Sequence, residues 1–61
     1  MKVRDLIRLL EAYGWRHVKT EGSHRKYVRP GTSGHLIVPG RRGDDVAPGT
    51  LHSILKKAGL R

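Results

Sequence analysis

Hydrophobic residues recur with helical spacing near both ends of the chain. The N-terminal stripe has the i, i+3, i+4, i+7 spacing of an amphipathic helix and consists of Val3, Leu6, Ile7 and Leu10. The C-terminal stripe repeats this spacing with Leu51, Ile54, Leu55 and Ala58. A glycine follows each stripe, at positions 14 and 59, and glycine readily takes the left-handed conformation after a helix end. The pattern predicts two helices, each with one face to bury.

Three short runs between these helices favour an extended chain: 15–21, 24–29 and 35–38. Gly22-Ser23 separates the first two runs, and Gly-X is a two-residue hairpin signal because glycine adopts the positive φ of a type II′ turn. Polar turn residues fill 30–34, and a loop is predicted at 41–49. We therefore expect an α+β fold in the order helix, strand, strand, strand, helix, with a three-stranded antiparallel sheet whose one face the two helices cover.

The predicted turn also assigns side chains to the two faces of the sheet. One face would hold three facing pairs: Glu21 with His24, Lys19 with Lys26, and His17 with Val28. The other face would hold two pairs and meet the helices: Val18 with Tyr27, and Thr20 with Arg25. Trp15 falls on the polar face in this register, and a one-residue bulge would invert the assignment for one strand.

Composition limits the function of a chain this short. Its 61 residues allow a single domain, 1–61, with a small core, so any site should be a shallow surface. The 13 Lys and Arg against 5 Asp and Glu give a net charge of +8, which attracts nucleic acid, anionic lipid or an acidic protein. Neither helical segment has the dense basic face of a membrane-binding helix. The absence of Cys and of a long apolar run favours a cytoplasmic protein, which we expect to be a monomer when free.

His24 is one of four histidines that could act in catalysis, because imidazole exchanges protons near neutral pH, and it stands next to a turn signal and basic residues. The neighbouring residues that would contact RNA are Lys19, Ser23, Arg25 and Lys26. With RNA, a base would take the proton of a ribose 2′-OH and an acid would protonate the leaving 5′-oxygen. His17 and Glu21 lie near in the predicted register, but nothing fixes either as a second proton-transfer group. A histidine after a turn is also often a plain surface residue.

Other residues have simpler explanations or remain open. We expect Trp15 and Tyr27 to pack in the core rather than to stack on a base. We expect Asp44 and Asp45 to stabilise the positive N-terminal end of the second helix. Lys56 and Lys57 suit the last turn of that helix, where cations complement its dipole. Arg41 and Arg42 could bind a phosphate or could simply add solubilising charge, and the sequence favours neither role. The four His residues lack a tight ligand spacing, so no metal and no cofactor is predicted.

Taken together, four segments make the chain similar to the HicA toxin family of bacterial toxin–antitoxin systems. They are Lys2–Leu10 with the following Gly14-Trp15, Gly22-Ser23-His24 with Tyr27, Leu36–Pro39, and Gly49–Leu60. Their order and spacing cover nearly the whole chain.

This resemblance implies a fold like that of the double-stranded RNA-binding domain. It also implies an endoribonuclease that cleaves mRNA and is held inactive by a cognate HicB-type antitoxin, with His24 of the Gly-Ser-His motif as its catalytic histidine. Two alternatives remain at this point: a non-catalytic RNA-binding module of the same fold, and a small adaptor for an acidic protein.

Overall fold

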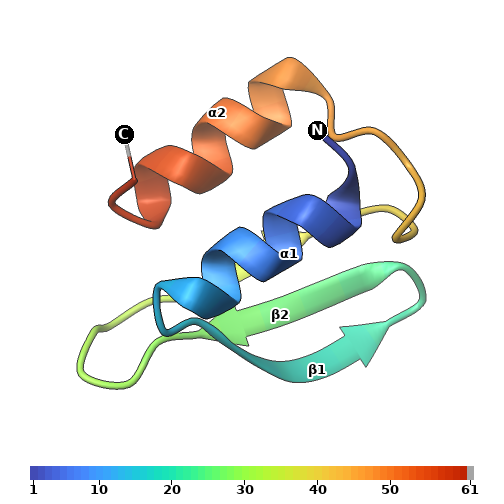
Figure 1. Cartoon of the computed structure of the whole chain (residues 1–61). Coiled ribbons are helices and arrows are strands. Elements are labelled where there is room, and N and C mark those ends of the chain that lie inside the picture. Colours follow the sequence, from blue (N-terminus) through green and yellow to red (C-terminus); the bar gives the residue numbers. More distant parts are fainter. Residues whose placement is uncertain (61) are drawn as a thin grey trace.

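The computed structural model describes residues 1–60, and its two helices lie on the same side of one sheet (Figure 1). The elements are α1 (Val3–Ala12), β1 (Arg16–Glu21), β2 (His24–Val28), β3 (Leu36–Val38) and α2 (Pro48–Lys57). The strands are antiparallel and ordered β1-β2-β3. The predicted α+β architecture, helix-strand-strand-strand-helix, is therefore confirmed.

Helix α1 ends in a way that fixes the chain entering β1. Gly14 has φ +91, its N–H donates to Glu11 O at 3.0 Å, and the N–H of Trp15 donates to Leu10 O at 3.0 Å. This pair of bonds is a Schellman motif, which satisfies carbonyls that the helix end leaves free. Trp15 is consequently directed into the core, where it is 5% exposed, as the sequence predicts.

The hairpin between β1 and β2 follows the predicted turn but not the whole predicted register. Gly22 has φ +58, and the pairs Glu21↔His24, Thr20↔Arg25 and Lys19↔Lys26 form as expected. The register then shifts between His17 and Lys19, so that His17 pairs with Tyr27. The predicted pairing of His17 with Val28 is wrong, because a β-bulge inserts one residue at this point. Val18, expected to face the helices, is 53% exposed.

The two faces of the sheet differ in burial. Tyr27 pairs with Leu36, and Arg25 pairs with Val38. Tyr27, Leu36 and Val38 are at most 2% exposed and form the face under the helices. The core also contains residues of both helices and of the connecting segments: Val3, Leu6, Ile7, Leu10, Trp15, Val46, Ile54 and Ala58. The opposite face, on which Lys26 pairs with Ile37, has no helix over it.

The segment before α2 corrects two expectations. The helix begins at Pro48, inside the predicted loop, because proline is tolerated at the first helical position, where no N–H partner is lost. Asp44 and Asp45 precede the first turn of α2, which contains no acidic residue. Asp44 Oδ2 instead accepts the N–H of Arg41 at 3.0 Å, and Asp45 Oδ1 lies 3.1 Å from Lys2 Nζ. Asp44 therefore stabilises the loop internally, and Asp45 links it to the N-terminal residues.

Candidate functional site

His24 is the first residue of β2, and its side chain is exposed. It lies on the same face of the sheet as Lys26, two residues further along the strand, which is the face that no helix covers. It borders a shallow hollow of about 240 Å³ over the sheet. Six residues from all three strands and the β3 approach line this hollow: Lys19, Glu21, His24, Lys26, His35 and Ile37. We call it the sheet hollow. Three of the predicted site residues, His24, Lys19 and Lys26, are thus brought together.

The two lysines of the sheet hollow differ in their electrostatic surroundings. Lys19 Nζ lies 2.6 Å from Glu21 Oε1, so its charge is partly neutralised, although both side chains are well exposed. Lys26 is half-buried and makes no ion pair with any carboxylate of residues 1–60. Lys26 is therefore the cation of this hollow that is available to a bound anion.

The imidazole of His24 has no hydrogen bond or ion pair with another side chain in the described part of the chain. Glu21 faces it across the strand pair, but its carboxylate contacts Lys19. Both ring nitrogens of His24 are consequently open to a ligand, and no second proton-transfer group is bonded to the ring.

The other two predicted RNA contacts lie differently. Ser23 occupies the turn before His24 and is half-buried. Arg25 lies on the face under the helices, and its Nη1 donates to the Gly40 carbonyl at 2.9 Å. The guanidinium of Arg25 therefore links β2 to the loop after β3, on the opposite side of the sheet from His24.

His17 is separated from His24 by the bulge. Its ring lies 5.5 Å from the ring of Tyr27 between centroids, and its Nε2 is 2.6 Å from Thr20 Oγ1. Burial raises the pKa of the Tyr27 hydroxyl, and the negative charge of Glu11 raises it further. Tyr27 lies on the face under the helices, and His17 contacts it, so His17 also lies on the helix side of the sheet and is not a partner for His24.

His35 is the site residue that sequence reasoning did not single out. It lines the sheet hollow with His24, at the end where the chain enters β3. The available signal was strand alternation, since His35 and Ile37 are two residues apart and Ile37 pairs with Lys26. His52 lies on α2 and lines neither this hollow nor the groove described next.

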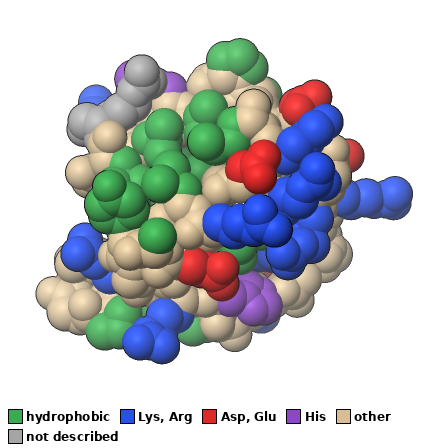
Figure 2. All heavy atoms as spheres, viewed as in Figure 1, with side chains coloured by type: hydrophobic (Ala, Val, Ile, Leu, Met, Phe, Trp, Pro, Cys, Tyr) green, Lys and Arg blue, Asp and Glu red, His purple; other side chains and the backbone are tan. Residues whose placement is uncertain are grey.

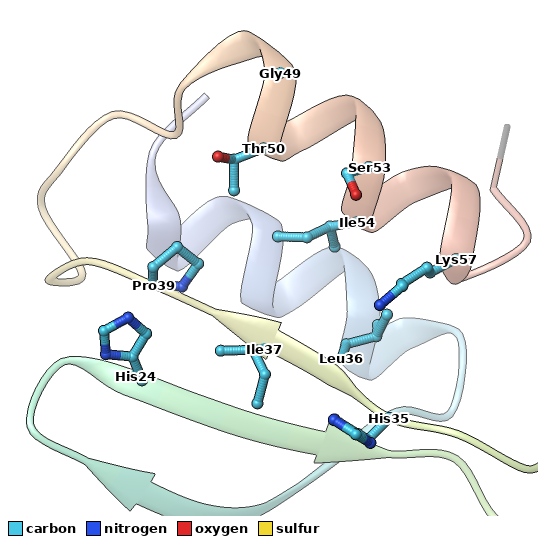
Figure 3. Close-up of a pocket in the computed structure, with 10 residues that line it drawn as sticks. All are labelled: His24, His35, Leu36, Ile37, Pro39, Gly49, Thr50, Ser53, Ile54 and Lys57. Atoms are coloured by element: carbon cyan, nitrogen blue, oxygen red, sulfur yellow. The ribbon is translucent and has the colours of Figure 1, made fainter.

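A larger groove of about 400 Å³ lies between β3 and α2 (Figure 3). Its lining comes from the strands, the turn after β3 and one side of α2: His24, His35, Leu36, Ile37, Pro39, Gly49, Thr50, Ser53, Ile54 and Lys57. We call it the β3–α2 groove. Lys57, predicted to lie in the last turn of α2, does so and also reaches this groove, whereas Lys56 does not line it.

A second basic surface lies on the helix side of the molecule. Figure 2 shows Lys and Arg side chains gathered beside α1. The segment containing Arg41 and Arg42 joins this helix, because the N–H of Arg4 donates to Arg42 O at 3.1 Å. Both arginines are exposed. They therefore lie near α1, and neither lines the two hollows that His24 borders.

Residues 1–60 contain no group of three or more His, Asp or Glu side chains that could hold a metal ion. None of the described helices is long and apolar enough to cross a membrane.

Comparison with models of known protein families gives a match. Residues 3–60, nearly the whole chain, match a family model whose description is "HicA toxin of bacterial toxin-antitoxin". No curated protein matches the chain.

Proposed function

The chain belongs to the HicA toxin family of bacterial toxin–antitoxin systems, and from this premise we propose that it is a metal-independent endoribonuclease that cleaves mRNA with His24. The observation that carries the proposal is the position of His24. Its imidazole is exposed and unbonded on an open sheet face, beside the unpaired ammonium of Lys26. A chain of phosphates can approach such a face without any rearrangement of the core.

In the proposed reaction, His24 transfers the protons and the lysines hold the phosphate. The imidazole removes the proton of a ribose 2′-OH, the 2′-oxygen attacks the adjacent phosphorus, and the bond to the 5′-oxygen breaks. The imidazolium or a water molecule returns a proton to that oxygen. Lys26, and Lys19 when released from Glu21, stabilise the charge that develops on the phosphoryl oxygens. A positioned acid or base of this kind contributes roughly 10²- to 10⁴-fold.

The test compares wild-type protein with His24→Ala on a defined single-stranded RNA in EDTA. His52→Ala is the matched control, because it makes the same substitution at a histidine outside both hollows. We expect His24→Ala to cut more slowly by roughly 10²-fold or more and His52→Ala to cut at the wild-type rate. Equal cleavage by wild type and His24→Ala would refute the catalytic assignment.

One observation favours a second candidate, a non-catalytic RNA-binding module. No side chain among residues 1–60 is bonded to His24 to complete an acid–base pair. This alternative requires RNA binding without cleavage in the same assay. An adaptor for an acidic protein would show neither RNA binding nor cleavage. A salt titration separates the adaptor from the enzyme and from the RNA-binding module, because phosphate contacts make RNA affinity fall steeply with salt.

A toxin–antitoxin pairing follows from the family, and we propose that a HicB-type antitoxin covers the sheet hollow and His24. Blocking this face inhibits the enzyme without unfolding it, since the core lies on the other side of the sheet. The free toxin would act on mRNA in the cytoplasm as a monomer. A purified complex that cleaves RNA as fast as the free protein would refute this arrangement.

A further inference from the structure

The β3–α2 groove has a histidine at each of its ends and a lysine at one of them. Figure 3 shows His24 and Pro39 near the end where α2 begins, and His35 and Lys57 near the other end. Between Thr50 and Lys57 the helix rises about 10 Å, so the two ends are separated by roughly that distance. This length suits one nucleotide with a phosphate at each side.

The lining of the groove combines apolar side chains with hydroxyl groups. Leu36, Ile37 and Ile54 provide apolar contact, with Ile37 40% exposed between the two ends. Thr50 and Ser53 add hydroxyl groups from the same side of α2 as Lys57. The lining contains no Asp or Glu. An apolar surface with two hydroxyls, an imidazole at each end and the ammonium of Lys57 at one end matches a nucleotide, which has a flat base, polar edges and anionic phosphates.

The groove is continuous with the sheet hollow. His24, His35 and Ile37 line both, so β3 forms the rim that they share. A strand held at His24 can therefore place its neighbouring nucleotide over this rim and against α2.

We propose that the β3–α2 groove binds the nucleotide next to the scissile bond of a single-stranded RNA. Thr50 and Ser53 contact the polar edge of the base, and Lys57 binds the phosphate on its far side. The inference rests on the proposed function and adds to it a subsite that selects the cleavage position.

The groove also decides between single-stranded and double-stranded RNA. A base enters it only when it is unstacked and unpaired, and such splayed bases occur in single strands, loops and bulges. In an A-form duplex every base is stacked and paired, so none can leave the helix to enter the groove. Although the fold resembles a double-stranded RNA-binding domain, the expected substrate is therefore unpaired RNA.

The first test measures binding without cleavage, in protein carrying His24→Ala. Lys57→Ala and Lys56→Ala change the net charge equally at neighbouring positions, but only Lys57 lines the groove. A phosphate contact on a single strand contributes a salt slope of about 0.7. We expect Lys57→Ala to reduce the slope by about that amount and to weaken binding about fivefold at about 0.1 M salt. Lys56→Ala should change neither quantity.

The second test maps the cut positions on a pool of randomised single-stranded RNA. Thr50→Val removes the hydroxyl and keeps the shape of the side chain, whereas Thr50→Ser keeps the hydroxyl. We expect Thr50→Val to change the preference for the nucleotide beside the cut by about 3- to 10-fold, and Thr50→Ser to retain the wild-type preference. Thermal unfolding of each variant checks that the fold is kept.

The outcomes separate this inference from the proposed function. Equal salt slopes for Lys57→Ala and Lys56→Ala, with an unchanged cut pattern in Thr50→Val, would overturn the groove assignment even if His24→Ala abolishes cleavage. Cleavage that persists in His24→Ala would overturn the catalytic proposal, while the slope comparison would still report on the groove. Groove variants that weaken the antitoxin complex but not RNA binding would assign the groove to the antitoxin and overturn the inference.

Discussion

Replacing Glu21 by Gln tests what the carboxylate beside His24 does. Glu21 faces His24 across the hairpin, and its Oε1 lies 2.6 Å from Lys19 Nζ. In the proposed reaction Glu21 transfers no proton. Its charge then only opposes a phosphate at His24 and withholds Lys19 from that phosphate, so the neutral amide should improve RNA binding.

The size of this effect follows from the spacing of facing residues. Side chains directly opposite in an antiparallel pair have Cβ atoms about 5 Å apart, which puts a phosphate at His24 about 6 Å from the Glu21 carboxylate. Both Lys19 and Glu21 are well exposed, so water screens the charges, and an effective dielectric constant of about 80 gives about 0.7 kcal/mol. This energy corresponds to roughly threefold tighter binding at low salt. The released Lys19 should also steepen the salt slope by up to about 0.7.

The assay combines RNA-binding titrations with single-turnover cleavage. Glu11→Gln is the control, since it makes the same change of net charge on α1, away from both hollows. We expect Glu21→Gln to bind RNA about threefold more tightly than Glu11→Gln, with a cleavage rate within about threefold of wild type. A fall of roughly 10²-fold or more in the cleavage rate is the signature of a lost acid or base. That result would refute our reasoning and identify Glu21 as the partner of His24.

Three further predictions concern the fold that holds the site. Burial raises the pKa of Tyr27, so its contribution to folding stability is full below the ordinary tyrosine pKa and is lost as pH rises through the higher folded value. In urea unfolding, Tyr27→Phe should therefore lose less of its free energy of unfolding at alkaline pH than wild type does. The same smaller loss in Tyr13→Phe, which changes an exposed tyrosine, would contradict this. Leu10→Ala should cost about 2–5 kcal/mol, a large share of the roughly 3–9 kcal/mol expected for a chain of this length, and a thermal midpoint close to that of wild type would contradict the packing. Gly22→Ala should cost about 1–2 kcal/mol because Gly22 has φ +58, and equal stability in urea would show that the turn tolerates a Cβ.

The helices and the hairpin turn were predictable because their signals are local. The stripe of Val3, Leu6, Ile7 and Leu10 fixes the buried face of α1 whatever it packs against, and all four are at most 3% exposed. Gly22-Ser23 similarly specifies its own turn. Periodicity and turn chemistry act over a few residues, so neither depends on the rest of the fold.

The full site was not predictable because it depends on pairing between distant segments. His35 reaches the sheet hollow only through the register of β3 against β2, across the intervening turn segment 29–35. The β3–α2 groove requires in addition that Thr50, Ser53 and Lys57 face β3. A helical pattern shows which residues share a side of α2, but not which strand that side meets.

The bulge at Val18 explains how one strand serves both the core and the candidate site. In a regular strand Trp15 and Lys19 would point to the same face, because side chains alternate with a period of two. The Schellman ending of α1 directs Trp15 into the core, whereas Lys19 lies beside His24 on the open face. One inserted residue reconciles these positions, and Val18 is left 53% exposed as a result. The same insertion turns His17 toward Tyr27, so the bulge keeps His17 off the face on which His24 and His35 border the sheet hollow.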